Sequence, residues 1–128
     1  MKTIRIERGW IGHFICGNEC RFRRNTLLEN GDIRVVISTV GNYYPEPEEK
    51  INTIGCNRYY ETMAFIAKKE GEYWEADVSR QIYFKSNWAL DYWDSPTIDI
   101  DADKMHEAVI AEIMRKINRG LNLDENNV

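Results

Sequence analysis

The sequence predicts an α+β fold: an antiparallel sheet of about four to six strands, with one C-terminal amphipathic helix packed on one face. Short apolar stretches bounded by glycine- and asparagine-containing turns fill the first two thirds of the chain, which is typical of strands joined as hairpins. A single stretch near the C-terminus has its apolar residues at helical spacing instead. The length of 128 residues fits one domain, expected over residues 1–121 with a frayed tail over 122–128.

The first strand is expected over residues 3–16. Alternation at period two puts its apolar side chains on one face: Ile4, Ile6, Trp10, Phe14 and Cys16. Gly9 and Gly12 interrupt this pattern, which indicates a bulge or a close approach of another group to the backbone.

The next two strands are expected to form a hairpin closed by Asn30-Gly31, because this pair is preferred in type I′ turns. The turn predicts the strands and their register: 21–29 and 32–40, with Leu28 opposite Ile33. Residues 35–37 are apolar on both faces, so the second of these strands is expected to be central in the sheet.

After a long connection over 41–56, a second hairpin is expected over 58–68 and 73–84, with its turn near Glu70-Gly71. This register places Glu61 opposite Arg80 as a cross-strand salt bridge.

The sequence after the second hairpin predicts two helices, a short one over 86–93 and a longer one over 102–119. The longer helix has Asp101 as its expected N-cap and Gly120 as its C′ residue. Its apolar stripe predicts three residues buried against the sheet: Val109, Ile113 and Ile117.

Charge and cysteine content narrow the functional classes. The net charge is −4, yet residues 1–40 carry seven basic and four acidic side chains, so a basic patch is confined to this part. Nucleic-acid binders are usually basic overall. No apolar run reaches the roughly 18 residues that span a bilayer. The odd number of cysteines, three, and the alternating N-terminus predict a cytoplasmic protein without a disulfide framework.

His13, Cys16 and Cys20 have a His-x2-Cys-x3-Cys spacing that suggests zinc or a nucleophile–base pair. On a regular strand, however, His13 and Cys16 point to opposite faces. The paired short spacings of common zinc modules are also missing. We therefore expect no metal, no cofactor and no catalytic residue in this group.

Arginine and tyrosine dominate binding hot spots, although tyrosine is also a common strand former and paired arginines often only solvate a sheet face. Mixed basic and aromatic residues also suit phosphates and stacked bases. The candidate binding residues are Trp10, His13, Arg21, Arg23, Tyr43, Tyr44 and Tyr59.

Two blocks, GWIGHFICGNECRFRRNTLLENGDIRVVISTVG and IGCNRYYETMAFIAKKEGEYWEADVSR, resemble a family of short proteins of unknown function carried by bacteriophages and other bacterial mobile elements. The resemblance covers about residues 5–117. It implies a small accessory protein that binds a component of a bacterial host.

The sequence therefore predicts a non-enzymatic binding protein whose partner is a host protein, with no membrane association. The first alternative is a small nucleic-acid or nucleotide binder that uses Arg21 and Arg23. The second alternative is an enzyme centred on His13. An exposed apolar patch favours the binding protein, a basic face with exposed aromatics favours the nucleic-acid binder, and a pocket containing His13 favours the enzyme.

Overall fold

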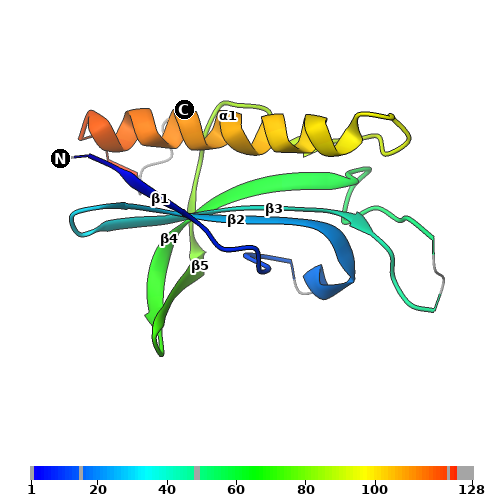
Figure 1. Cartoon of the computed structure of the whole chain (residues 1–128), viewed down its shortest axis with the longest axis horizontal. Helices are drawn as coiled ribbons and strands as arrows, with labels where there is room; N and C mark the ends of the chain where they lie inside the picture. The colour runs from blue at the N-terminus through cyan, green and yellow to red at the C-terminus, as the bar shows by residue number, and fades with distance from the viewer. Residues whose placement is uncertain (1, 15, 48–49, 121, 124–128) are drawn as a thin grey trace.

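Helix α1 (Ile98–Asn118) covers one face of a six-stranded antiparallel sheet, so the expected α+β fold is confirmed (Figure 1). The computed structural model describes residues 2–14, 16–47, 50–120 and 122–123. The strand order is β1-β2-β3-β4-β5, and β6 pairs with β4 beside the end of β5. The strands are β1 (Ile4–Glu7), β2 (Cys20–Asn30), β3 (Ile33–Tyr43), β4 (Tyr60–Glu70), β5 (Tyr73–Ile82) and β6 (Ala89–Leu90).

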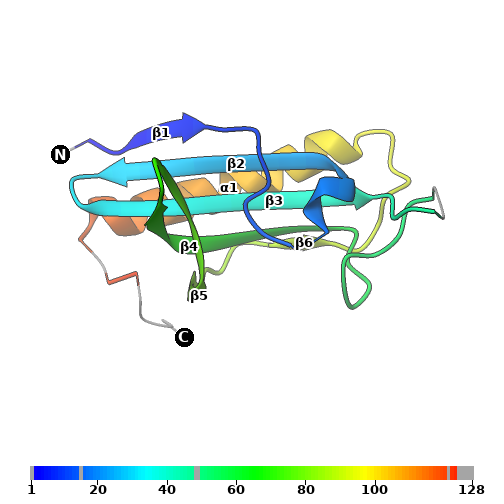
Figure 2. The same cartoon turned by 90° about the horizontal axis from the view of Figure 1, so that it is seen from below.

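The main core lies between α1 and the sheet. As predicted, Val109, Ile113 and Ile117 are buried there, and Leu28 and Ile37 face them from β2 and β3. Full burial of a side chain of this size stabilises the fold by about 1.5–3 kcal/mol. On the other face of the sheet, which we call the open face, the described residues place no α-helix, only the short 3-10 helix η1 (Gly17–Glu19) (Figure 2).

The first hairpin forms, but its turn differs from the prediction by one residue. The turn residues are Gly31-Asp32, and the register sets Leu28 opposite Val35 rather than Ile33. Gly31 has a φ of 59° and Asp32 does not share a positive φ, which fits a type II′ turn with glycine in its first central position. The displacement is two residues, so every side chain keeps its predicted face. β3 is central, as expected.

The second hairpin has a larger error. Ala67 pairs with Ala76, whereas Phe65 pairs with Gln81, so residues 77–80 of β5 bulge out of the ladder. The pairing is already displaced by two residues at the turn, where Glu70 pairs with Tyr73, and the bulge displaces it further. The predicted cross-strand pair of Glu61 and Arg80 is therefore wrong. The backbone of Glu61 instead pairs with Ala89 of β6.

Two other predicted elements are also wrong. The first strand ends at Glu7 rather than at residue 16, because Gly9 and Phe14 both have a φ of 74°, outside the strand region. The helix expected over 86–93 is replaced by β6, whose two residues complete the edge of β4 where β5 no longer pairs.

Helix α1 begins four residues earlier than predicted, with Thr97 rather than Asp101 as its N-cap. Asp99 and Asp101 lie in its first turn, where their charge favours the helix dipole. Gly120, at a φ of 67°, follows the C-cap as expected. Leu123, expected in the frayed tail, is buried in the main core, and residues 124–128 lie outside the described residues.

His106 of α1 is fully buried and joins the helix to three strands through hydroxyl groups. Its Nε2 lies 2.8 Å from Thr26 Oγ1, and its Nδ1 lies 2.6 Å from Thr39 Oγ1. Thr39 Oγ1 lies 2.6 Å from Thr62 Oγ1, and Thr26 donates to Glu7 at 2.7 Å. The Glu7 carboxylate only accepts, so Thr26 has no proton left for the imidazole. Nε2 of His106 must therefore carry the proton, and Nδ1 accepts from Thr39.

We predict that His106 makes the fold sensitive to mild acid. Burial, reinforced by Arg24, lowers the pKa of His106 from 6.5 to about 3. The unfolded chain therefore binds more protons than the folded one between these values, and stability falls as pH falls below 6.5. We expect a loss of about 1.4 kcal/mol per pH unit, or about 2 kcal/mol from pH 7.5 to pH 5, in urea unfolding.

The control is His106→Gln, which keeps one donor and one acceptor but does not titrate. The free energy of unfolding is measured against pH for both proteins. Subtracting the values of the variant from those of the wild type removes the contribution of the carboxylates, whose stabilisation is lost only at lower pH. Parallel profiles between pH 7.5 and 5 would show that His106 is not held neutral.

Candidate functional site

Residues 8–14 and 16–19 lie across the open face of the sheet, and we call this segment the strap (Figure 2). Arg8 anchors its start, because Nε and Nη2 both donate to Asn25 Oδ1, at 3.1 and 2.9 Å. Its third nitrogen donates to the carbonyl oxygen of Trp74 on β5. Arg8 therefore connects the strap to both β2 and the second hairpin.

Gly12 lies directly against the middle of β3. A Cβ atom at this position would lie 2.5 Å from Ser38 Cβ, so no other residue fits without displacing the strap or the strand. The close approach predicted at Gly12 is thus real, but the approaching group is the chain's own sheet.

His13 continues this contact as the centre of a buried hydrogen-bond network. Its Nδ1 lies 2.7 Å from Ser38 Oγ and its Nε2 lies 2.8 Å from Glu61 Oε2. Arg58 donates to the other oxygen of Glu61 at 3.0 Å. Burial alone raises the pKa of the Glu61 carboxyl, but the hydrogen bonds from His13 and Arg58 outweigh burial and hold the pKa below its usual range. Glu61 is therefore ionised, and Nε2 of His13 donates to it.

Serine, histidine and glutamate in a hydrogen-bonded row are the groups of a hydrolase triad. A nucleophile must also reach its substrate, and Ser38 is 0% exposed beneath Gly12. A pocket of about 270 Å³ between β4 and the segment before β6 is lined by Arg58, Glu61 and Trp88, but not by His13. The network therefore fixes the strap to the sheet and offers no accessible nucleophile.

The strap and the second hairpin enclose a groove of about 430 Å³ on the open face, which we call the aromatic groove. The hairpin tip curls away from α1 and passes in front of β2, as Figures 1 and 2 show. Its wall residues come from β1, β2, the strap and β5: Ile6, Leu27, Trp10, Tyr73 and Trp74. The Trp10 and Tyr73 rings meet edge to face, with centroids 5.7 Å apart.

The two rings at the mouth of the aromatic groove are solvent-exposed, Trp10 to 39% and Tyr73 to 58%. Two arginines of the chain pack against tryptophan rings of the groove. The guanidinium carbon of Arg8 lies 4.7 Å from the Trp10 ring centroid, and that of Arg34 lies 4.4 Å from the Trp74 centroid. These contacts hold the rings in fixed positions without covering them.

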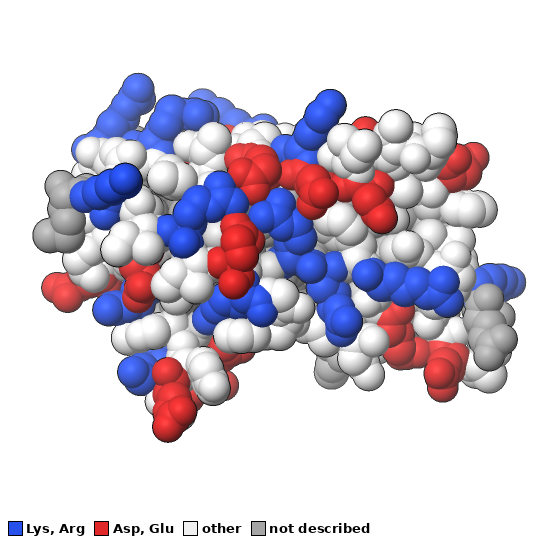
Figure 3. Space-filling view, in the orientation of Figure 1, with Lys and Arg blue, Asp and Glu red and all other residues white. Residues whose placement is uncertain are grey.

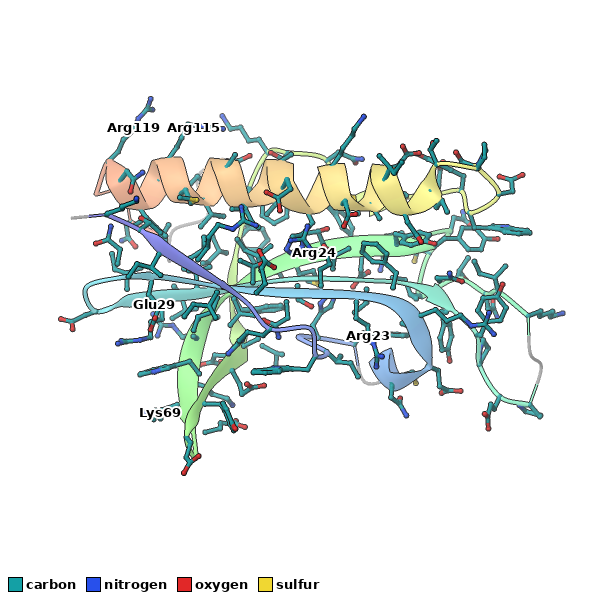
Figure 4. The ribbon with its side chains drawn as sticks, viewed as in Figure 1. Arg23, Arg24, Glu29, Lys69, Arg115 and Arg119 are labelled. Carbon is teal, nitrogen blue, oxygen red and sulfur yellow. The ribbon has the colours of Figure 1, made fainter. Side chains whose placement is uncertain are left out.

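Arg21, Arg23 and Tyr44 come together in a second, polar hollow at the other end of β2. The Arg21 guanidinium carbon lies 3.6 Å from the centroid of the Tyr44 ring. Glu19 and Glu46 line the same hollow, so its charge is balanced. Figure 4 shows Arg23 on the open-face side of the sheet and Arg24 on the helix side.

The seven predicted residues therefore do not form one site. Tyr43 packs edge-on against Phe14 at the end of the strap, with centroids 5.4 Å apart. The ring of Tyr59 lies beside that of Trp93 near the start of α1, with the two ring centroids 6.5 Å apart. Trp10 reaches the aromatic groove, whereas His13 belongs to the buried network.

Sequence reasoning missed Tyr73 and Trp74, the hairpin residues of the aromatic groove. Two adjacent aromatics beside a predicted turn are a signal that one of them is exposed, because neighbouring residues on a strand face opposite sides. Nothing in the sequence shows that the hairpin curls towards Trp10, because the curl accompanies the irregular pairing of β5.

The basic excess of residues 1–40 is largely neutralised by ion pairs. Arg5 and Arg24 both contact Glu7 and Glu107, and Arg34 contacts Glu29. Figure 3 shows the result, with blue and red side chains interspersed rather than separated. The side of the molecule shown there does not present the continuous basic face that nucleic acid favours.

Cys16 is half-buried, Cys20 is buried and Cys56 is exposed, so the three cysteines lie in different environments. Burial raises the pKa of the Cys20 thiol to about 12. Across residues 2–14, 16–47, 50–120 and 122–123, no group of three metal-ligating side chains is arranged to hold an ion. None of the described helical segments is long and apolar enough to cross a membrane.

Comparisons with protein-family models, with curated proteins and with solved structures found no match to this chain.

We predict that Gly12→Ala destabilises the protein by about 1–3 kcal/mol, because the added methyl overlaps Ser38 and forces the strap off the sheet. Urea unfolding measures the loss. The matched test is a double-mutant cycle with Ser38→Gly, which removes the overlapping atoms. The double variant should lose less stability than the sum of the single variants. Additive losses would show that Gly12 and Ser38 are not in contact.

Proposed function

We propose that this chain is a non-enzymatic binding protein of the phage or mobile-element type, which acts on a host protein in the bacterial cytoplasm. The observation that carries the proposal is the exposure of Trp10 and Tyr73 in the aromatic groove. The groove supplies the partner's contact surface.

The composition of this surface supports the proposal. Protein interfaces are enriched in aromatic and arginine residues at their centre and have a polar rim that excludes water. The aromatic groove is lined by Trp10, Tyr73 and Trp74. Polar residues line it as well, among them Glu29, which is paired with Arg34, and Glu72.

The rigidity of this surface is a second support. Trp10 lies between Arg8 and Gly12, and both of these residues are fixed to the sheet. Side chains that are already held in place lose little conformational freedom when a partner binds, which favours affinity.

We predict that Trp10→Ala with Tyr73→Ala weakens partner binding while the fold persists. A photo-crosslinking amino acid in place of Val78, on β5 and 69% exposed, should capture the partner in host lysate, and mass spectrometry identifies it. The purified partner is then titrated calorimetrically. Hot-spot truncation costs about 2 kcal/mol or more, so we expect at least about a 30-fold weaker affinity.

The matched control is Trp93→Ala, which removes a tryptophan that is 45% exposed and lies outside the aromatic groove. It should leave the affinity unchanged. A partner that binds the Trp10/Tyr73 double variant as tightly as the wild type would disprove this contact surface.

The polar hollow supports a second candidate, a nucleic-acid or nucleotide binder. Arg21 stacked on Tyr44, with Arg23 nearby, offers cationic and aromatic groups to a phosphate and a base. Glu19, Glu46 and the net charge of −4 oppose this candidate. The enzyme centred on His13 has less support, because Ser38 is covered.

We predict no binding of a fluorescent single-stranded 12-nucleotide DNA or of labelled ATP at physiological salt, measured by anisotropy. Arg21→Ala with Arg23→Ala should change the melting temperature by only a few degrees, because exposed charges contribute little to stability. Wild-type binding that is lost in this double variant, with the fold intact, would instead establish the second candidate.

A further inference from the structure

We propose that the aromatic groove receives a lysine or arginine side chain from a basic segment of the partner protein. This inference rests on the proposed function and names the chemistry of the partner.

The charges that line the groove favour a cation. Three lining residues are glutamates and one is a cation, Arg8. Glu7 is already paired with Arg5 and Arg24, and Glu29 is paired with Arg34. Glu72 is therefore the lining carboxylate that has no ion pair with a described residue. The Arg8 guanidinium is buried and already donates to Asn25 and to the Trp74 carbonyl, so it is not available to an anionic partner. An incoming positive charge therefore has the Glu72 carboxylate as its partner.

The aromatic rings of the groove suit the same cation. The face of a tryptophan or tyrosine ring attracts lysine and arginine through its quadrupole. The chain uses this attraction itself, with Arg8 over Trp10, and with Arg34 and Lys69 over Trp74.

Tyr73 and Glu72 are the two groove residues that remain available. No lysine or arginine of the described residues packs over the Tyr73 ring, and Glu72 forms no ion pair with them. These neighbours lie at the tip of the second hairpin, opposite Trp10 across an edge-to-face contact. A cationic side chain that packs on the exposed Tyr73 ring lies beside both an aromatic face and the neighbouring residue Glu72.

A random 12-residue peptide library displayed on phage tests the proposal without the natural partner. The purified full-length protein is the bait, and the Trp10→Ala/Tyr73→Ala variant is the counter-selection that removes peptides bound elsewhere. We expect the groove-dependent peptides to be enriched in lysine or arginine at a fixed position. Replacing that residue by norleucine in a synthetic peptide should weaken binding at least tenfold.

Two matched variants test whether Glu72 is the carboxylate that binds the cation of the peptide. Glu72→Gln should weaken the peptide at least threefold, whereas Glu70→Gln, in the same hairpin but outside the groove and paired with Lys68, should not. Groove-dependent peptides that lack a conserved cation would overturn this inference and leave the proposed function intact. If no selected peptide depends on Trp10 and Tyr73, both the inference and the proposed contact surface fail.

Discussion

Polar residues in the middle of the two central strands are the constraint on which the rest of the structure depends. β3 carries Ser38 and Thr39 in succession, and β4 carries Glu61 and Thr62 at the same level. Neighbouring residues on a strand face opposite sides, so buried polar groups lie on both faces of the sheet. A buried hydroxyl or carboxylate without a partner costs about 1–3 kcal/mol or more. Each covering segment must therefore bring a hydrogen-bonding group to this level.

The chain's two histidines meet this requirement from opposite sides. His106 of α1 bridges Thr26 and Thr39 on the helix face, and His13 of the strap bridges Ser38 and Glu61 on the open face. Displacing either segment along the sheet would break both hydrogen bonds of its histidine. Apolar packing tolerates such displacements more readily, because it has no directional requirement. The two networks therefore fix where the helix and the strap lie.

Sequence reasoning predicted the features that local chemistry decides: the fold class, the places of both hairpins but not their registers, the burial of Ile113 and the stop at Gly120. It did not predict features that depend on distant residues. The block around His13 looked like a ligand set because its polar density is unusual, but its partners Ser38 and Glu61 lie 25 and 48 residues away. The aromatic groove likewise joins Trp10 to Tyr73 through the curl of a hairpin, which no local pattern encodes. A buried network and a ligand site use the same residue types, so the sequence does not separate them.

The two faces of the sheet are held in different ways, and this difference is why we propose the binding surface on the open face. The helix face buries a continuous aliphatic core and supplies most of the stability. The open face buries less apolar surface and is held by directional contacts of Arg8, Gly12 and His13. Those contacts fix the backbone on both sides of Trp10 but leave its ring 39% exposed, beside a hairpin tip that exposes Tyr73. A strap that served only to cover the sheet would gain more by turning this tryptophan inward, because its burial is worth several kcal/mol. The exposed orientation of Trp10 is therefore the feature from which we propose a partner on this face.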